Sequence, residues 1–393
     1  MKRLFAPLAA LTLAASCVTS GSPPPETSQP AVVAAACEIT GLVEASRERL
    51  AECVSPYSWA REIDETLHAF VEPILRQVAA AVSAYLAELN DDNFSGAILV
   101  AKDFVPFASK ATGYADRAHG APNATITPFN IASVTKVFTA VAIGQLVDQG
   151  KVSLDDPLSK YLPTYPKPIG DQITIAMLVG QTAGTGDYLG DPGYLRVRDT
   201  FESLSELVGA VNIGVTPGTV PGKAFAFSST GYLLLGAVIE KASGRDFYDY
   251  MDNELFAKAG VAAGFLHNTE EERSDRGFAL GYKPDDSQNW SGLPARGTPA
   301  TGAYATAPDL LSFHKALATG ALVKPETLKR LVLLPSGQAS AGLASGVFSG
   351  DDVGASAVFA MTPNGYTVIV LANVGGAAQP VADRILKVVA PGT

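Results

Sequence analysis

Strand-like segments lie near both ends of this chain of 393 residues, and a mostly helical stretch lies between them. Residues 95–102 and 107–114 have the pattern of strands. Residues 354–361 and 366–372 have it again, and a Thr-Pro-Asn-Gly turn joins this later pair. This order predicts an α+β fold, in which a sheet is assembled from both ends of the chain around an inserted helical region.

Helical periodicity marks several separate segments. Residues 63–89 have it, with an interruption expected at Pro73 because proline removes a hydrogen bond from a helix interior. A short helix is expected to start within residues 152–157, where two aspartates precede Pro157. Other helices are expected at residues 130–150, 200–211, 232–242, 307–317, 324–334 and 378–389.

Composition excludes some functions. With 47% hydrophobic and 17% charged residues, the chain can bury the core of one large domain or of two closely joined domains. A net charge of −10 gives no support to nucleic-acid binding. The histidines lack the spacing of metal ligands, so we expect no metal and no cofactor; they are His68, His119, His267 and His314.

The first residues have the pattern of an export signal. Lys2 and Arg3 precede a short apolar run, which predicts a signal peptide over residues 1–16 and an exported protein of the periplasm or cell envelope. Residues 13–17 resemble a bacterial lipoprotein cleavage site, so a lipid anchor on Cys17 is the one membrane contact we expect, with plain secretion as the alternative. The polar, proline-rich residues 17–36 are then a tether.

Two further cysteines, Cys37 and Cys53, flank a helical pattern within residues 37–62. In an exported protein this pair predicts a disulfide that staples a small N-terminal extension. Two free buried thiols are the alternative. The remaining residues, 63–393, form the expected main domain.

The segment from Asn130 to Gly150 predicts a buried helix that opens with Ser133 and Lys136. Residues three apart share one face of a helix, so the hydroxyl and the amine can form a hydrogen bond. A lysine among apolar residues loses proton affinity and can act as base for a neighbouring serine. The motif alone is weak, because Ser312 and Lys315 repeat it without other catalytic signals nearby.

From Phe94 to about Val389 the chain resembles the serine β-lactamase and penicillin-binding-protein superfamily. The resemblance is greatest to the branch of class C β-lactamases, D-Ala-D-Ala carboxypeptidases and related esterases. It depends on motifs that keep their order and spacing over about 300 residues. These are residues 94–103, 113–116, 129–136 (FNIASVTK), 146–163, 173–175, 181–184, 221–222 and 225–236 (FAFSSTGYLLLG).

This resemblance implies a five-stranded antiparallel sheet flanked by helices, with an all-helical subdomain and a site between them. It also implies that Ser133 is the acylated nucleophile and Lys136 its proton acceptor. The oxyanion would then bind the backbone N–H groups of Ser133 and of the residue after the glycine of a third motif.

The second motif departs from the family pattern. Its usual Tyr-x-Asn reads Phe227-Ser228-Ser229 here, so the phenol that would move protons is replaced by phenylalanine. Ser229 stands at the asparagine position and can still form a hydrogen bond to substrate. Either Phe227 merely packs, or Lys136 or a water carries all proton transfer.

The third motif, usually Lys-Thr-Gly or His-x-Gly, is placed at Phe348-Ser349-Gly350. Phenylalanine again replaces a functional group, here the cation that helps to hold a substrate carboxylate, which argues against β-lactams and D-Ala-D-Ala peptides. Asp351 would offer its N–H to the oxyanion, provided that its carboxylate points away. Arg296 could replace the lost cation, although a solvated loop arginine is the simpler interpretation.

Three hypotheses stay open. The first is a β-lactamase-related serine hydrolase of reduced or altered activity, acting on small neutral esters or amides through an acyl-enzyme on Ser133. The second is a catalytically impaired penicillin-binding-like protein that acylates slowly. The third is a non-catalytic envelope protein that uses the cleft for binding. The sequence also leaves open whether Tyr282 or Tyr304 approaches Ser133.

Overall fold

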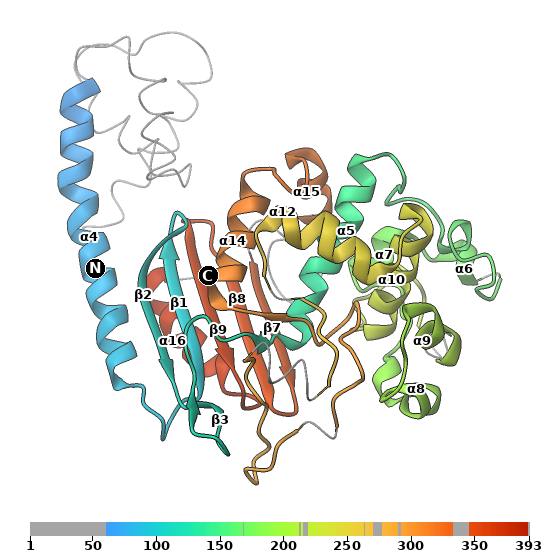
Figure 1. The fold of residues 1–393 in the computed structure, drawn as a ribbon. Helices are drawn as coiled ribbons and strands as arrows, with labels where there is room; N and C mark the ends of the chain where they lie inside the picture. Colours follow the sequence, from blue (N-terminus) through green and yellow to red (C-terminus); the bar gives the residue numbers. More distant parts are fainter. Residues whose placement is uncertain are drawn as a thin grey trace.

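The computed structural model describes residues 60–391, except for residues 168, 212–213, 215–218, 263, 270–276, 290–291 and 333–345. The predicted signal peptide, the tether, Cys17 and the Cys37–Cys53 pair therefore lie outside the described residues. The order of elements confirms the predicted α+β class, with strands at both ends of the domain and helices between them (Figure 1).

One five-stranded antiparallel sheet organises the domain, in the order β2-β1-β9-β8-β7. Its two early strands, β1 and β2, pair with each other. The strand β1 also pairs with β9, the last strand of the chain, so the sheet joins the two ends of the domain. The strands are β1 (Gly96–Lys102), β2 (Val105–Thr112), β7 (Gly346–Asp352), β8 (Ala355–Met361) and β9 (Tyr366–Ala372).

Both faces of the sheet are covered, which explains why β1, β8 and β9 are almost entirely apolar and almost entirely buried. Side chains alternate between the faces: Leu99 joins the core on the side of the helical region, and Val100 joins a second core. The helices α4 (Ala60–Glu88) and α16 (Ala378–Val389) cover the second side (Figure 1). The strand β7 is the edge next to the helical region.

The helix α5 (Thr135–Asp148) lies between the sheet and the helical region (Figure 1). Its residues from Thr135 to Leu146 are all buried, so it is enclosed by protein as predicted. It ends before Gly150, whose φ of +69° is the left-handed conformation that glycine adopts readily.

Short helices fill the inserted region, and two more follow it before the sheet resumes. In chain order they are the 3-10 turn η2 (Leu158–Lys160), α6 (Ile169–Gln172), α7 (Ile175–Val179), the 3-10 turn η3 (Tyr188–Gly190), α8 (Pro192–Val197), α9 (Leu204–Ala210), α10 (Ser229–Ser243), α11 (Phe247–Tyr250), the π-helical segment η4 (Met251–Phe256), α12 (Ala257–Ala259), α14 (Ala307–Ala318) and α15 (Pro325–Val332).

Two local predictions were wrong. The helix α4 runs through Pro73 without interruption. Pro73 is exposed, so water can bind the carbonyl that lacks a helical donor there. The segment at residues 152–157 leads into a 3-10 turn at Leu158–Lys160, because Pro157 is in an extended conformation.

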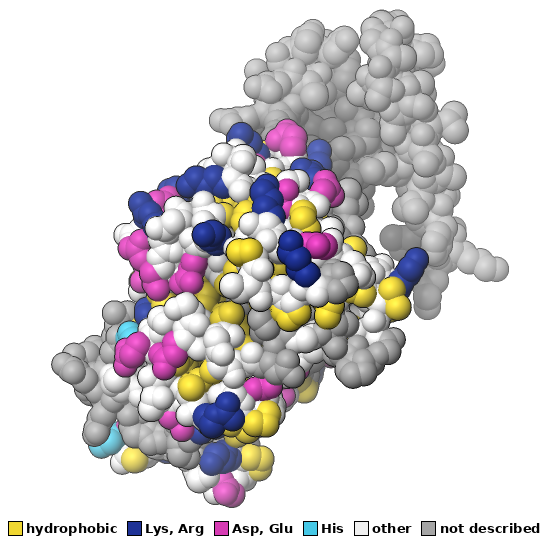
Figure 2. Space-filling model, turned by 90° about the vertical axis from the view of Figure 1, so that its right-hand side faces the viewer, with side chains coloured by type: hydrophobic (Ala, Val, Ile, Leu, Met, Phe, Trp, Pro, Cys, Tyr) yellow, Lys and Arg dark blue, Asp and Glu magenta, His cyan; other side chains and the backbone are white. Residues whose placement is uncertain are grey.

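No helix among the described residues is both long and apolar enough to span a bilayer. On the face shown in Figure 2, basic and acidic side chains are interspersed and hydrophobic side chains lie between them.

Candidate active site

A short two-stranded pairing lies just before Ser133 in the chain. The strand β5 (Phe129–Asn130) pairs with β6 (Tyr304–Ala305), and Asn130 Oδ1 accepts a hydrogen bond of 2.9 Å from Ala132 N. Ala132 has a φ of +45°, which costs a non-glycine residue energy and occurs mainly where surrounding structure fixes it. The strained residue directly precedes Ser133, in the 3-10 turn η1 (Ala132–Val134) that opens α5.

The edge strand β7 lies against this turn at Gly350. A Cβ added to Gly350 would lie 2.5 Å from Ser133 N and 2.7 Å from Ile131 O, so only glycine fits there without a backbone shift. The predicted third motif therefore reaches the nucleophile. The alignment that placed Phe348-Ser349-Gly350 on the strand at the edge of the cleft agrees with this geometry.

Lys136 lies one helical turn after Ser133 and is directed toward it. Its Nζ is 3.0 Å from Ser133 Oγ and donates a 2.8 Å hydrogen bond to the Ala300 carbonyl. The side chain is only 7% exposed, and this burial lowers the pKa of Lys136 to about 8, while the negative charge of Asp187 acts in the opposite direction. A pKa of about 8 leaves about one amine in ten neutral at pH 7, and this neutral form can act as a base.

Two aromatic rings lie over the amine. The centroid of Phe227 is 4.9 Å from Lys136 Nζ, and that of Tyr232 is 5.7 Å away. The Tyr232 hydroxyl donates to the Val179 carbonyl at 3.0 Å, so the ring covers Lys136 while its phenol is occupied elsewhere. Phe227 therefore does more than fill space, because its face can attract the ammonium form of Lys136.

The two serines of the second motif have different environments. Ser228 caps α10: its Oγ accepts from Gly231 N at 2.8 Å and donates to Gly186 O at 2.7 Å. Ser229 is 1% exposed, and its Oγ finds no hydrogen-bond partner within the described part of the chain. It lies one turn before Tyr232 on α10, hence on the helix face whose Tyr232 ring covers Lys136.

The residues of β7 divide between its two faces. Phe348 pairs with Phe359 and packs against the core that contains α5, so it shares the face of Gly350. Asp351 lies on the opposite face, where its carboxylate accepts a 2.6 Å hydrogen bond from Gly376 N, close to the start of α16. Its charge therefore points away from Ser133. Strand alternation puts the Ser349 side chain on the same side as Asp351, away from Ser133.

Other candidate groups are occupied elsewhere. The Arg296 guanidinium stacks on the Tyr248 ring at 3.6 Å and donates to the Phe265 carbonyl, so it neither replaces the lost cation nor is simply solvated. The Tyr282 hydroxyl accepts from Arg117 N. In the second Ser-x-x-Lys motif, Lys315 is exposed, and apolar enclosure of its amine is lacking.

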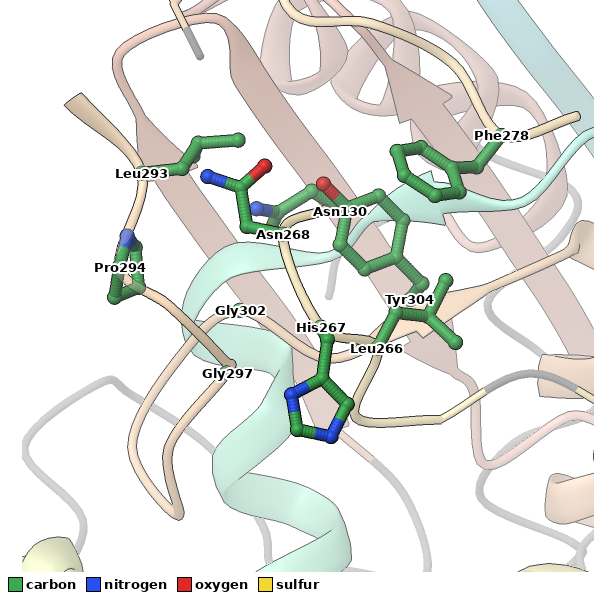
Figure 3. Close-up of a pocket in the computed structure, with 10 residues that line it drawn as sticks. All are labelled: Asn130, Leu266, His267, Asn268, Phe278, Leu293, Pro294, Gly297, Gly302 and Tyr304. Atoms are coloured by element: carbon green, nitrogen blue, oxygen red, sulfur yellow. The ribbon is translucent and has the colours of Figure 1, made fainter. Parts of the chain in front are cut away.

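A small hollow lies beside the strand that leads to Ser133 (Figure 3). Tyr304 and Asn130 line it from the paired strands, and Leu266, Phe278 and Leu293 form apolar walls. It has room for about one water molecule, which is too little for an ester substrate. Tyr304 therefore belongs to this hollow and to the β5–β6 pairing.

Sequence reasoning missed two parts of the site. The Ala300 carbonyl that binds Lys136 is a backbone group, so the residue type at position 300 gives no sign of this hydrogen bond. Tyr232 belongs to the matching stretch 225–236 and opens the helix predicted at residues 232–242, but the start of α10 at Ser229, which puts both residues on one helix face, was not predicted.

Comparison with known proteins gives consistent matches. The family model described as Beta-lactamase matches residues 78–390. The protein PbpX of Bacillus subtilis (strain 168) is 29% identical over 300 residues, which are 74% of this chain and 72% of that protein. Several other curated relatives are matched over about half of their own length or less.

Solved structures share the fold. A penicillin binding protein from Bacillus halodurans has a TM-score of 0.65 and 29% identity, covering 78% of this chain and 98% of its own. A D-amino acid amidase from Ochrobactrum anthropi SV3 has a TM-score of 0.62 at 22% identity, covering 81% and 98%, and supports the fold alone. These matches confirm the family that the motifs predicted. The chain belongs to the Beta-lactamase family of serine hydrolases.

Proposed function

We propose that this protein is a hydrolase that cleaves small neutral esters or amides through an acyl-enzyme on Ser133. The observation that carries the proposal is the 3.0 Å contact between Ser133 Oγ and the buried Nζ of Lys136. A hydroxyl within hydrogen-bond reach of a partly neutral amine is the arrangement that an activated serine requires.

Each step uses groups that are already in place. Ser133 Oγ attacks the substrate carbonyl carbon while its proton moves to neutral Lys136 Nζ, which becomes an ammonium. The Ala300 carbonyl and the Phe227 ring stabilise this cation. The ammonium then returns the proton to the departing oxygen or nitrogen, and a water hydrolyses the acyl ester by the same route. The Ser133 and Asp351 N–H groups are the expected oxyanion donors.

The preference for a neutral substrate follows from the third motif. Phe348 occupies the position of the usual cation, and Arg296 is bound to Tyr248 and to Phe265 O. A substrate carboxylate would therefore lose its solvation without meeting the third-motif cation that usually binds it. Lacking the second-motif phenol, the enzyme is expected to be slower than relatives that have it, by roughly 10²–10⁴.

Covalent labelling tests the proposal. The mature protein is incubated with a fluorescent fluorophosphonate and, separately, with a fluorescent penicillin, and the labelled residue is identified by peptide mass spectrometry. We expect fluorophosphonate to label Ser133, with turnover of a neutral ester such as p-nitrophenyl butyrate. Ser133→Ala should abolish both, whereas Ser312→Ala, in the second Ser-x-x-Lys motif, should change neither.

Other outcomes point to the remaining hypotheses. Stable labelling by penicillin without ester turnover would favour the slow acylating protein. Absence of label at Ser133 with both probes over several hours would refute the hydrolase and leave a non-catalytic role for the cleft.

A further inference from the structure

Exposed apolar side chains are concentrated in one segment beside the nucleophile. Of the nine large hydrophobic side chains that are exposed in the described part of the chain, three lie between residues 220 and 227. They are Val220 at 61%, Phe225 at 38% and Phe227 at 46% exposed. Single exposed apolar residues are ordinary, but three within eight residues of the chain form a local concentration that calls for an explanation.

Backbone hydrogen bonds hold this segment in a fixed position. Gly222 N donates to Thr182 O, and Ala226 N donates to Gln181 O, both at 2.8 Å. Gly222 has a φ of +79° and lies against Met177, whose Cε would be 2.9 Å from an added Cβ. The apolar side chains are therefore presented at set positions without being buried, and a rigid wall loses little entropy when it binds a ligand.

The segment ends at the catalytic amine. Phe227 lies 4.9 Å from Lys136 Nζ, and that atom lies 3.0 Å from Ser133 Oγ. Phe348 lies on the face of β7 that carries Gly350 against Ser133 N. Phenylalanine side chains thus lie on both the α10 side and the β7 side of the nucleophile, and neither has a charge or a hydrogen-bond donor.

We infer that the acyl group transferred to Ser133 is an uncharged hydrocarbon chain, and that Val220 and Phe225 bind it beyond Phe227. The inference rests on the proposed hydrolase function. The acyl group stays attached to Ser133 through both chemical steps, whereas the leaving group departs after the first. Contacts between a fixed apolar wall and the acyl group can therefore stabilise the transition states of both acylation and deacylation.

The experiment measures kcat/KM for p-nitrophenyl acetate, butyrate, hexanoate and octanoate below their micelle-forming concentrations. For the native protein we expect a rise of about twofold to fourfold per added methylene up to hexanoate, as burial of each CH₂ predicts. The double variant Val220→Ser/Phe225→Ser should retain the acetate rate within about twofold and lose most of this rise. Val105→Ser is the matched control, because Val105 is also 61% exposed but lies on β2, at the sheet edge opposite β7.

Two results would overturn the inference while leaving the hydrolase in place. One is a native kcat/KM that does not increase from acetate to hexanoate. The other is an increase that the double variant retains in full. If no ester is turned over and fluorophosphonate leaves Ser133 unlabelled, the proposed function and this inference both fail, and the labelling result separates that case from the first two.

Discussion

The pH dependence of Ser133 acylation should show the lowered pKa of Lys136 directly. Burial lowers this pKa to about 8. The neutral fraction of the amine is then about one in ten at pH 7 and about nine in ten at pH 9, so labelling by fluorophosphonate should accelerate about tenfold and level off. A lysine with the ordinary value near 10.4 would give about a hundredfold rise over the same interval, with no plateau.

The assay is stopped-time fluorescence labelling from pH 6 to pH 10, corrected at each pH for hydrolysis of the probe. Lys136→Arg removes the base while keeping a positive charge, and it should reduce the rate by at least a hundredfold at every pH. Lys315→Arg, in the second Ser-x-x-Lys motif, is the matched control and should follow the native curve. A logarithmic rate that rises with unit slope beyond pH 9, or one that does not change with pH, would refute Lys136 as a desolvated base.

Four further predictions address the site and the stability of the fold. Phe227→Tyr should increase ester turnover tenfold or more, because the ring already lies 4.9 Å from Lys136 Nζ and the new phenol can donate a proton. Gly350→Ala should reduce labelling at least a hundredfold, because its Cβ would meet Ser133 N at 2.5 Å; Gly209→Ala, where an added Cβ has open space, should have little effect. Burial lowers the pKa of His314 to about 4, below its unfolded value, so the native state should lose up to about 3 kcal/mol as pH falls from 6.5 to 4, measured as a shift in the urea midpoint that His314→Gln diminishes. Lys136→Met should raise the free energy of unfolding at pH 7 by about 3 kcal/mol, because it removes a buried ammonium. This gain should decline between pH 8 and pH 10.5, where the Lys136 amine is neutral in the folded state and progressively loses its proton in the unfolded state.

Contrary results would identify which step of the reasoning is wrong. Unchanged turnover in Phe227→Tyr would mean that proton transfer to the leaving group is not slow. Full labelling of Gly350→Ala would mean that β7 can move away from Ser133 at little cost. An acid transition identical in the native protein and His314→Gln would place the titrating group elsewhere. A destabilised Lys136→Met at pH 7 would show that the Ala300 hydrogen bond outweighs desolvation of the amine.

The fold was predictable because its strands and long helices each keep one hydrophobic pattern along their length. The strands β1, β8 and β9 are mostly apolar and are bounded by turn residues, and the expected limits are within about two residues of those observed. Pro73 shows where such reasoning fails: proline disfavours a helix locally, but α4 continues through it at an exposed position. Tertiary support for the rest of the helix outweighs the loss of one hydrogen bond.

The site was predictable where side chains carry the chemistry. Ser133 and Lys136 were found because an amine and a hydroxyl at helical spacing form a recognisable pair. Backbone groups and orientations were not accessible: the Ala300 carbonyl has no sequence signal, and the direction of Asp351 depends on which face of β7 it occupies. Arg296 could not be assigned either, because its stacking on Tyr248 requires two segments about fifty residues apart to meet.

The phenylalanines at positions 227 and 348 affect how the pKa of Lys136 is lowered. A cation at residue 348 would repel the ammonium form of Lys136 and favour loss of its proton, so replacing it with phenylalanine removes one common means of lowering this pKa. Burial of the Lys136 amine supplies the lowering instead. A charged group bound in the same apolar surroundings would itself shift the Lys136 pKa. The proposed preference for a neutral substrate therefore fits a lysine whose protonation state depends on desolvation rather than on a neighbouring charge.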